Sequence, residues 1–290
     1  MIEPQPDQFL GLDPLGFHAV HYLDWRAPSG TSGRTAICVH GLTRNSRDFD
    51  FLAEALVTGG GPITRVICAD IAGRGQSDWL TDPNNYGYPQ YLADMTALIA
   101  RLDVEEVDWI GTSMGGLIGM SLAALPKSPI RRLVLNDIGP VISKASLQRI
   151  SDYVGLDYRF SSTEALEKHL RKIHAPFGPL TDAQWQHMAL HSQRQVDGGN
   201  LSLAYDPAIA ENVKRAIADV HIWSLWDQIA CPVLVLRGAE SDILSAETAQ
   251  EMTERGPKAK LITFAGVGHA PALMAGDQID IVSGWLSKTA

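Results

Sequence analysis

Residues 107–117 decide the fold, and they read Val-Asp-Trp-Ile-Gly-Thr-Ser-Met-Gly-Gly-Leu. A short apolar run leads into a G-x-S-x-G pattern, which predicts a strand that ends, a sharp backbone turn and the start of a helix. Gly111 and Gly115 lack a Cβ atom, so the strand and the helix can approach closely at the turn. The turn would expose the hydroxyl of Ser113 in front of a helix N-terminus, which suits a nucleophile that generates an oxyanion. The alternative is a glycine-rich turn that happens to contain a serine.

The rest of the chain alternates between short apolar runs and longer amphipathic segments. The runs rich in Val, Ile and Leu are typical of strands buried on both faces, and they cover residues 35–39, 65–69, 107–110, 131–135, 232–236 and 261–264. Helices are predicted between them at residues 49–57, 89–102, 115–125, 246–255 and 278–286. Residues 17–25 alternate apolar and polar side chains, as an edge strand or a hairpin arm would. The alternation predicts an α/β fold with a mostly parallel central sheet flanked by helices.

The strand and helix alternation is interrupted between two predicted strands. Residues 140–227 contain several helical patterns and no confident strand. We therefore expect residues 1–139 and 228–290 to form the core domain, and residues 140–227 to form a helical insertion over the C-terminal edge of the sheet.

Composition and the N-terminal sequence bear on the partners and the location of the protein. The 290 residues are 45% hydrophobic and 20% charged, with a net charge of −9, which disfavours nucleic acid and anionic membranes as partners. The N-terminus shows no secretory signal and no apolar run is long enough to span a bilayer, so a cytoplasmic location is predicted. Cys38, Cys68 and Cys231 lie in or beside apolar runs and are predicted to be free core residues.

Two further loops offer partners for the serine. His269 lies in Gly-Val-Gly-His-Ala-Pro directly after the last predicted strand, where a loop histidine is free to act as a general base. Asp242 follows the strand at 232–236 and is the predicted acid, although its position before a helix also suits an N-cap. Asp137 follows the strand at 131–135 and is the rival acid, and Glu240 is a solvated fallback.

The loop after the strand at 35–39 is predicted to bind an oxyanion. His40-Gly41-Leu42 follows this strand directly, and a glycine there lets backbone amides turn inward. The predicted donors are the amides of Leu42 and of Met114, the residue after the serine. His40 is expected to brace the loop through hydrogen bonds, with a role as base the alternative.

These motifs together resemble the α/β-hydrolase fold superfamily. The superfamily has its nucleophile, acid and base in the chain order shown here by Ser113, Asp242 and His269. Residues 70–77 form a D-x-x-G-x-G-x-S segment, which is expected to have a structural role in a tight loop. The resemblance runs from His40 to the C-terminus, except for the insertion, which resembles the variable cap (lid) of that superfamily. Haloalkane dehalogenases and epoxide hydrolases of this fold carry aspartate at the elbow, so Ser113 argues against both.

The resemblance implies an acyl-enzyme hydrolase acting with water on a small to medium carboxylic ester or lactone, in which Asp242 orients His269 and no metal or organic cofactor takes part. The alternatives are a carbon–carbon hydrolase of ring-fission products, against which Ala270-Pro271 argues, and a cofactor-free haloperoxidase or perhydrolase. A non-enzymatic ligand-binding module on the same fold is a further alternative.

The oligomeric state stays open between a monomer and a homo-oligomer. Candidate substrate-binding residues are Arg44, Asn45, Trp185, His187 and Met188, with Phe160, Phe177 and His191 as further pocket candidates, and each has core packing or surface exposure as its alternative.

Overall fold

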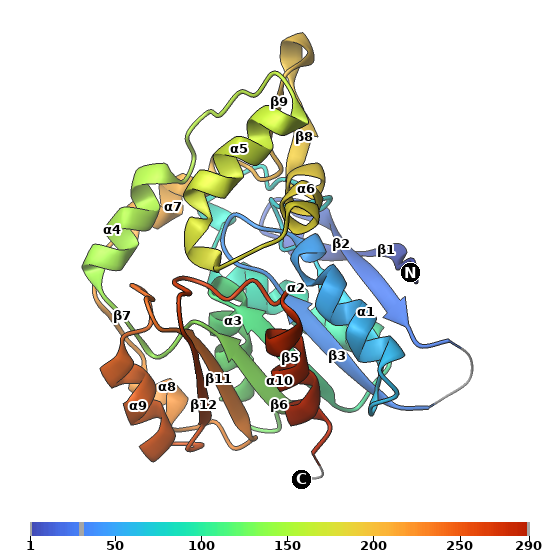
Figure 1. Cartoon of the computed structure of the whole chain (residues 1–290), viewed down its shortest axis with the longest axis vertical. Coiled ribbons are helices and arrows are strands. Elements are labelled where there is room, and N and C mark those ends of the chain that lie inside the picture. The colour runs from blue at the N-terminus through green and yellow to red at the C-terminus, as the bar shows by residue number, and fades with distance from the viewer. Residues whose placement is uncertain (1, 29–31, 289–290) are drawn as a thin grey trace.

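An eight-stranded sheet forms the centre of the computed structural model, which describes residues 2–28 and 32–288 (Figure 1). Its strands in spatial order are β1 (Gln5–Asp13), β2 (Gly16–Arg26), β4 (Ile63–Ala69), β3 (Arg34–Val39), β5 (Val107–Thr112), β6 (Ile130–Asn136), β11 (Val233–Gly238) and β12 (Lys260–Phe264). From β4 to β12 all neighbouring strands are parallel, whereas β1, β2 and β4 pair antiparallel. The predicted mostly parallel sheet is therefore confirmed, and residues 17–25 are the inner arm of a hairpin whose outer strand was not predicted.

Helices cover both faces of this sheet. One face packs against α1 (Asp50–Thr58) and α10 (Gly276–Leu286), whose buried residues share an apolar cluster with β3 and β4. The opposite face packs against α2 (Tyr88–Arg101), α3 (Met114–Ala123), α8 (Trp223–Trp226) and α9 (Ala246–Glu254). Strands covered on both sides need apolar side chains on both faces, and this is why β11 begins with the continuous apolar run Val-Leu-Val-Leu. Cys38 and Cys68 are free and buried at paired positions of β3 and β4.

The segment between β6 and β11 lies mainly beyond one end of the sheet, above the core in Figure 1. Besides α8, which packs against the sheet, its helices are α4 (Lys144–Tyr153), α5 (Thr163–Ile173), α6 (Asp182–His191) and α7 (Ile209–Arg215). Short strands that the sequence did not predict also occur, as the pairs β7 (Val141–Ile142) with β10 (Val220–His221) and β8 (Gln193–Gln195) with β9 (Leu201–Leu203). Short 3-10 turns cover Ser46–Phe49, Pro83–Asn85, Ala175–Phe177 and Asp197–Gly199. In the described part of the chain, no helix is long and apolar enough to cross a membrane.

Candidate active site

Ser113 lies at the turn between β5 and α3. Its backbone has φ 51° and ψ −112°, in the positive-φ range that costs energy for a residue with a side chain. The Ser113 amide donates to the Asn136 carbonyl at 3.0 Å, so the end of neighbouring strand β6 holds the turn. The strain and its support are those that the elbow pattern predicts.

The two glycines of the pattern leave no room for a Cβ atom. A Cβ on Gly111 would lie 2.3 Å from the Gly115 carbonyl oxygen, and one on Gly115 would lie 2.0 Å from the Val39 carbonyl oxygen. Strand β5, strand β3 and the first turn of α3 therefore meet through bare backbone. The close approach expected from the sequence is confirmed.

His269 bridges the serine and a carboxylate. It lies in the loop between β12 and α10, and its Nε2 is 3.0 Å from Ser113 Oγ. Its Nδ1 is 2.7 Å from Asp137 Oδ2, on a side chain that is fully buried. Because a carboxylate only accepts hydrogen bonds, Nδ1 carries the proton and Nε2 presents its lone pair to the serine hydroxyl.

The structure contradicts the prediction that Asp242 is the carboxylate that orients His269. Asp137, the rival residue, meets His269, whereas the half-exposed Asp242 side chain pairs with Arg149 of α4. The reason is the strand order: β6 lies next to β11, so Asp137 at the end of β6 reaches the donors at the end of β11. Those donors are the Gly238 amide at 2.8 Å and the Ser241 hydroxyl at 2.5 Å. The fallback Glu240 is exposed, as expected.

The Leu42 loop packs against the serine. An added Cβ on Gly41 would lie 3.7 Å from Ser113 Cβ, which places this loop directly beside the nucleophile. Within residues 2–28 and 32–288, the Leu42 and Met114 amides donate to no protein acceptor. Met114 is the first residue of α3, where amides lack partners within the helix. Both predicted oxyanion donors are therefore free amides near Ser113.

His40 braces this loop, as expected. Its Nε2 accepts from the Ile71 amide at 3.0 Å, so Nδ1 carries the proton and donates to the Gly41 carbonyl at 2.7 Å. Complete burial lowers the pKa of His40 to about 4, because the charged form would lose its hydration. The ring is therefore neutral at physiological pH, and both of its nitrogens are used in hydrogen bonds that hold the loop.

The segment at residues 70–77 supports the same loop. The Asp70 carboxylate accepts from the Ser46 and Gln76 amides at 2.7 and 2.9 Å, which confirms its expected structural role. Arg74, a residue that the sequence did not single out, is fully buried and donates from Nε to the Leu42 carbonyl at 2.9 Å. Its only sequence signal was its position inside that glycine-rich segment.

A small cavity of about 30 Å³ lies beside the serine and histidine. Thr112 and Ala270, the neighbours of Ser113 and His269, form part of its wall, and Met188 closes it from α6. The full lining is Arg44, Asp48, Phe49, Thr112, Phe177, Met188, Ala270, Pro271, Ala272 and Met274. Of the candidate pocket residues, Arg44, Met188 and Phe177 thus border the cavity.

The other candidates for substrate binding have different surroundings. Trp185 and Phe160 are buried in an apolar cluster shared with α5. Asn45 caps the turn at Ser46–Phe49 and donates to the His191 carbonyl at 2.8 Å, and His187 contacts the Arg47 carbonyl at 3.1 Å. These contacts hold α6 against the core and do not border the cavity. Even Arg44 at the cavity wall is paired with Asp48 and with the Ser192 hydroxyl of the insertion.

The fold and these motifs match a known family model over residues 36–280, that of the alpha/beta hydrolase family. The chain belongs to this family. Its predicted fold class and its identification as a hydrolase are thereby confirmed.

One curated protein and two solved structures are similar to the chain over almost its full length. The chain is 45% identical over 279 residues to a 3-hydroxybutyrate-oligomer hydrolase from Cupriavidus necator, covering 93% of each protein. A solved alpha/beta hydrolase from Novosphingobium aromaticivorans is 36% identical with a TM-score of 0.86, covering 99% of both chains. A solved structure of a Rickettsia typhi protein is 32% identical with a TM-score of 0.89, covering 100% of both.

Proposed function

We propose that the chain is a serine hydrolase that cleaves carboxylic esters, with Ser113 as nucleophile, His269 as general base and Asp137 as the orienting acid. The observation that carries the proposal is the pair of distances at His269, 3.0 Å to Ser113 Oγ and 2.7 Å to Asp137 Oδ2. A nucleophile, a base and a group that orients the base, all within hydrogen-bond reach, are the requirement for acyl transfer.

The first half of the reaction forms an acyl-enzyme. As Ser113 Oγ attacks the ester carbonyl, His269 Nε2 takes the hydroxyl proton, and Asp137 stabilises the resulting imidazolium through Nδ1–H. The carbonyl oxygen becomes an oxyanion, which the Leu42 and Met114 amides bind. A donor of this kind contributes about 3 kcal/mol to transition-state stabilisation. The intermediate collapses when the carbon–oxygen bond to the alcohol breaks and His269 gives its proton to the departing oxygen.

The second half releases the acid. His269 takes a proton from water, whose oxygen attacks the acyl carbon, and the same two amides bind the second oxyanion. When the bond to Ser113 Oγ breaks, His269 returns the proton to the serine. Water is thus the second substrate.

The substrate class we propose is a short linear oligoester of a hydroxy acid, of the 3-hydroxybutyrate type. The support is the 45% identical relative named for that hydrolysis. The cavity wall agrees with a short aliphatic chain, because Phe49, Met188 and Ala272 give it apolar surface while Arg44 and Asp48 add polar groups. A lactone, the other ester substrate that the sequence suggested, is the alternative.

We propose that residues 140–227 act as a cap that moves during turnover. A cavity of about 30 Å³ has room for little more than a water molecule. An ester with two hydroxyacyl units is larger than this volume, and we propose that α6 and Met188 shift when substrate enters. The apolar cluster around Leu166, Leu170 and Ala189 of α5 and α6 is distinct from the two clusters of the sheet, which supports movement of these two helices together. By contrast, Ile209 and Ala210 of α7 belong to a cluster of the sheet, so α7 is expected to stay with the core.

The test is the release of 3-hydroxybutyrate from its linear dimer and trimer, measured by chromatography for the wild type and for Ser113→Ala. We expect turnover by the wild type and a loss of at least about 10⁴-fold in the variant. A p-nitrophenyl ester, a lactone and a ring-fission substrate in parallel separate the oligoester from the other ester, lactone and carbon–carbon alternatives.

Labelling of Ser113 by a fluorophosphonate tests the nucleophile independently of substrate choice. Inactivity on every substrate together with absent labelling would overturn the enzymatic proposal in favour of a ligand-binding module. We also propose, as the sequence predicted, a cytoplasmic location and no nucleic-acid or membrane partner. The oligomeric state, monomer or homo-oligomer, is measurable by analytical ultracentrifugation.

A further inference from the structure

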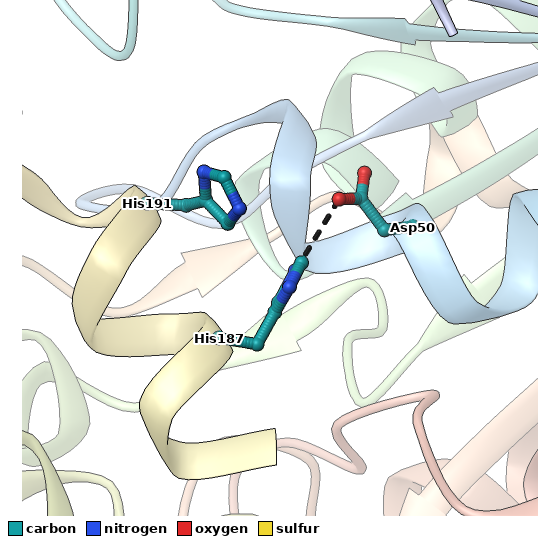
Figure 2. Close-up of side chains that lie close together, drawn as sticks. All are labelled: Asp50, His187 and His191. Carbon is teal, nitrogen blue, oxygen red and sulfur yellow. Dashed lines mark ion pairs between the residues drawn. The ribbon is translucent and has the colours of Figure 1, made fainter. Parts of the chain in front are cut away.

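Two histidines and an aspartate converge outside the proposed active site. His187 and His191 lie one turn apart on α6, and Asp50 is the first residue of α1. Figure 2 shows the three side chains pointing toward one another across the gap between the two helices. One ligand atom from each, a ring nitrogen or a carboxylate oxygen, lies within 4.8 Å of the other two.

The hydrogen bonds of this cluster leave ligand atoms free. His187 Nε2 donates to the Arg47 carbonyl at 3.1 Å and lies 3.3 Å from Asp50 Oδ2. The other carboxylate oxygen, Asp50 Oδ1, has no partner among the described residues, although the Asp50 side chain is only 8% exposed. The His191 ring likewise makes no hydrogen bond within residues 2–28 and 32–288, and its nearest aromatic neighbour is His187, 4.5 Å away between ring centroids.

We propose that Asp50, His187 and His191 bind a divalent transition-metal cation such as Zn²⁺. Two imidazoles and one carboxylate are a donor set that this class of cation prefers, whereas Mg²⁺ and Ca²⁺ favour sites made of oxygen atoms. Histidines at positions i and i+4 project from one face of a helix and can bind the same ion. The buried Asp50 carboxylate supplies the anionic ligand, and its Oδ1 has no partner among the described residues.

Arg47 limits how tightly the cation binds. Its Nε donates to Asp50 Oδ2 at 2.6 Å, so this guanidinium and the cation would share one carboxylate. Repulsion between the two positive charges sets the expected affinity below that of structural zinc sites with four protein ligands. The cation also displaces the Nε2 proton that His187 donates to the Arg47 carbonyl. We therefore expect reversible binding in the micromolar range.

The position of the site gives it a structural consequence. His187 and His191 belong to the segment proposed as the cap, and Asp50 belongs to the core. Without a cation, α6 is held at this end by the Asn45 amide on the His191 carbonyl and by the His187 contacts. A bound cation adds coordination bonds between α6 and α1, and so fastens the cap to the core.

Direct titration with Zn²⁺ by calorimetry tests the site without reference to any substrate. We expect one Zn²⁺ per chain for the wild type and an affinity more than about 10-fold lower for His191→Ala, which loses a ligand while leaving no hydrogen bond broken. The matched control is His221→Ala, at an exposed histidine of β10 outside the cluster. Asp50→Asn is a second variant, expected to weaken binding through the other helix. Unchanged affinity in both His191→Ala and Asp50→Asn, or no stoichiometric binding by the wild type, overturns the proposal.

Hydrogen exchange tests the link between cap and core. With saturating Zn²⁺ we expect the α6 amides to exchange more slowly in the wild type and in His221→Ala, but not in His191→Ala. Equal exchange of α6 with and without Zn²⁺ in the wild type would show that the cation does not fasten the cap. Neither measurement depends on ester hydrolysis, so failure here and failure of the proposed function are separate results.

Discussion

The Ser241 hydroxyl donates to Asp137 Oδ2 at 2.5 Å, the same carboxylate oxygen that lies 2.7 Å from His269 Nδ1. The loop after β11 therefore does not supply the proposed acid but holds it, with the Gly238 amide on the other oxygen, Oδ1. Three donors fix a fully buried carboxylate, and that carboxylate fixes the imidazole. The orientation of His269 thus depends on residues from β6 and β11 together.

Replacing the acid tests which carboxylate serves His269. We expect Asp137→Asn to lower kcat by about 10⁴-fold, because an amide cannot hold the tautomer that presents Nε2 to the serine. Asp242→Asn should keep nearly full turnover, since Asp242 pairs with Arg149 at the surface. Both are measured on the 3-hydroxybutyrate dimer, with circular dichroism to confirm folding. The opposite pattern would return Asp242 to the proposed triad.

Removing the Ser241 hydroxyl probes the support of the acid. Ser241→Ala deletes the donor to Asp137 and strands the Ile243 and Leu244 amides, which donate to that hydroxyl at 3.2 and 3.1 Å. We expect the free energy of unfolding to fall by about 1–3 kcal/mol and kcat to fall by about 10-fold. Urea unfolding and steady-state kinetics measure these changes. The exposed neighbour substitution Glu240→Gln is the control and should alter neither, and wild-type values for Ser241→Ala would contradict the role given to this hydroxyl.

The contrast between Asp242 and Asp137 shows where sequence reasoning ends. Both aspartates follow a buried strand, and the pattern of apolar runs located those strands correctly. Which carboxylate faces His269 depends on β6 and β11 being neighbours in the sheet and on Asp137 adopting a positive φ of 57°. Neither is readable from residue types. Ser113 and His269 were predictable because glycine-flanked motifs report local backbone geometry, which the sequence encodes directly.

The same limit applies to the segment between β6 and β11. Its helices were predictable from their amphipathic pattern, but strands as short as β7 and β10 exist only through their pairing with each other. Arg74 is a further case, because its contact with the Leu42 carbonyl joins two loops that are far apart in the chain. Side chains of α6 proved equally hard to assign, since helical spacing does not distinguish Met188 at the cavity from Trp185 in the apolar cluster.

A methyl group at the elbow should break the contact between strand and helix. In Gly115→Ala the new Cβ would lie 2.0 Å from the Val39 carbonyl oxygen, and neither backbone can move without disturbing β3 or α3. We expect a loss of about 3 kcal/mol or more in stability, or no folded protein. Thermal unfolding followed by circular dichroism gives the measurement.

Gly284→Ala is the matched control for that substitution. Gly284 is an exposed position in α10 with no atom within 4 Å of an added Cβ. Alanine there should raise stability by about 0.5–1 kcal/mol through helix propensity. Equal effects of the two substitutions would mean that the elbow does not require a bare backbone.

The buried neutral His40 predicts how stability responds to acid. Burial lowers its pKa from 6.5 to about 4 in the folded state, so between these pH values the unfolded chain binds more protons than the folded chain. The contribution of His40 to the free energy of unfolding is therefore fully present above pH 6.5 and is lost as the pH falls toward 4. At pH 5 the loss amounts to about 2 kcal/mol relative to pH 7.5.

Comparing the wild type with His40→Ala isolates this effect, because every other titrating group is common to both proteins. At pH 7.5 we expect the variant to be less stable by about 3 kcal/mol, since the buried Ile71 amide and Gly41 carbonyl lose their partner. At pH 5.0 the wild type has lost the stability that neutral His40 contributes. The difference in stability between the wild type and the variant is therefore expected to narrow by about 2 kcal/mol. Urea unfolding at the two pH values measures the gap. A gap that stays constant would mean that His40 is not held neutral in the folded protein, and its assignment as a neutral brace of the Leu42 loop would then be wrong.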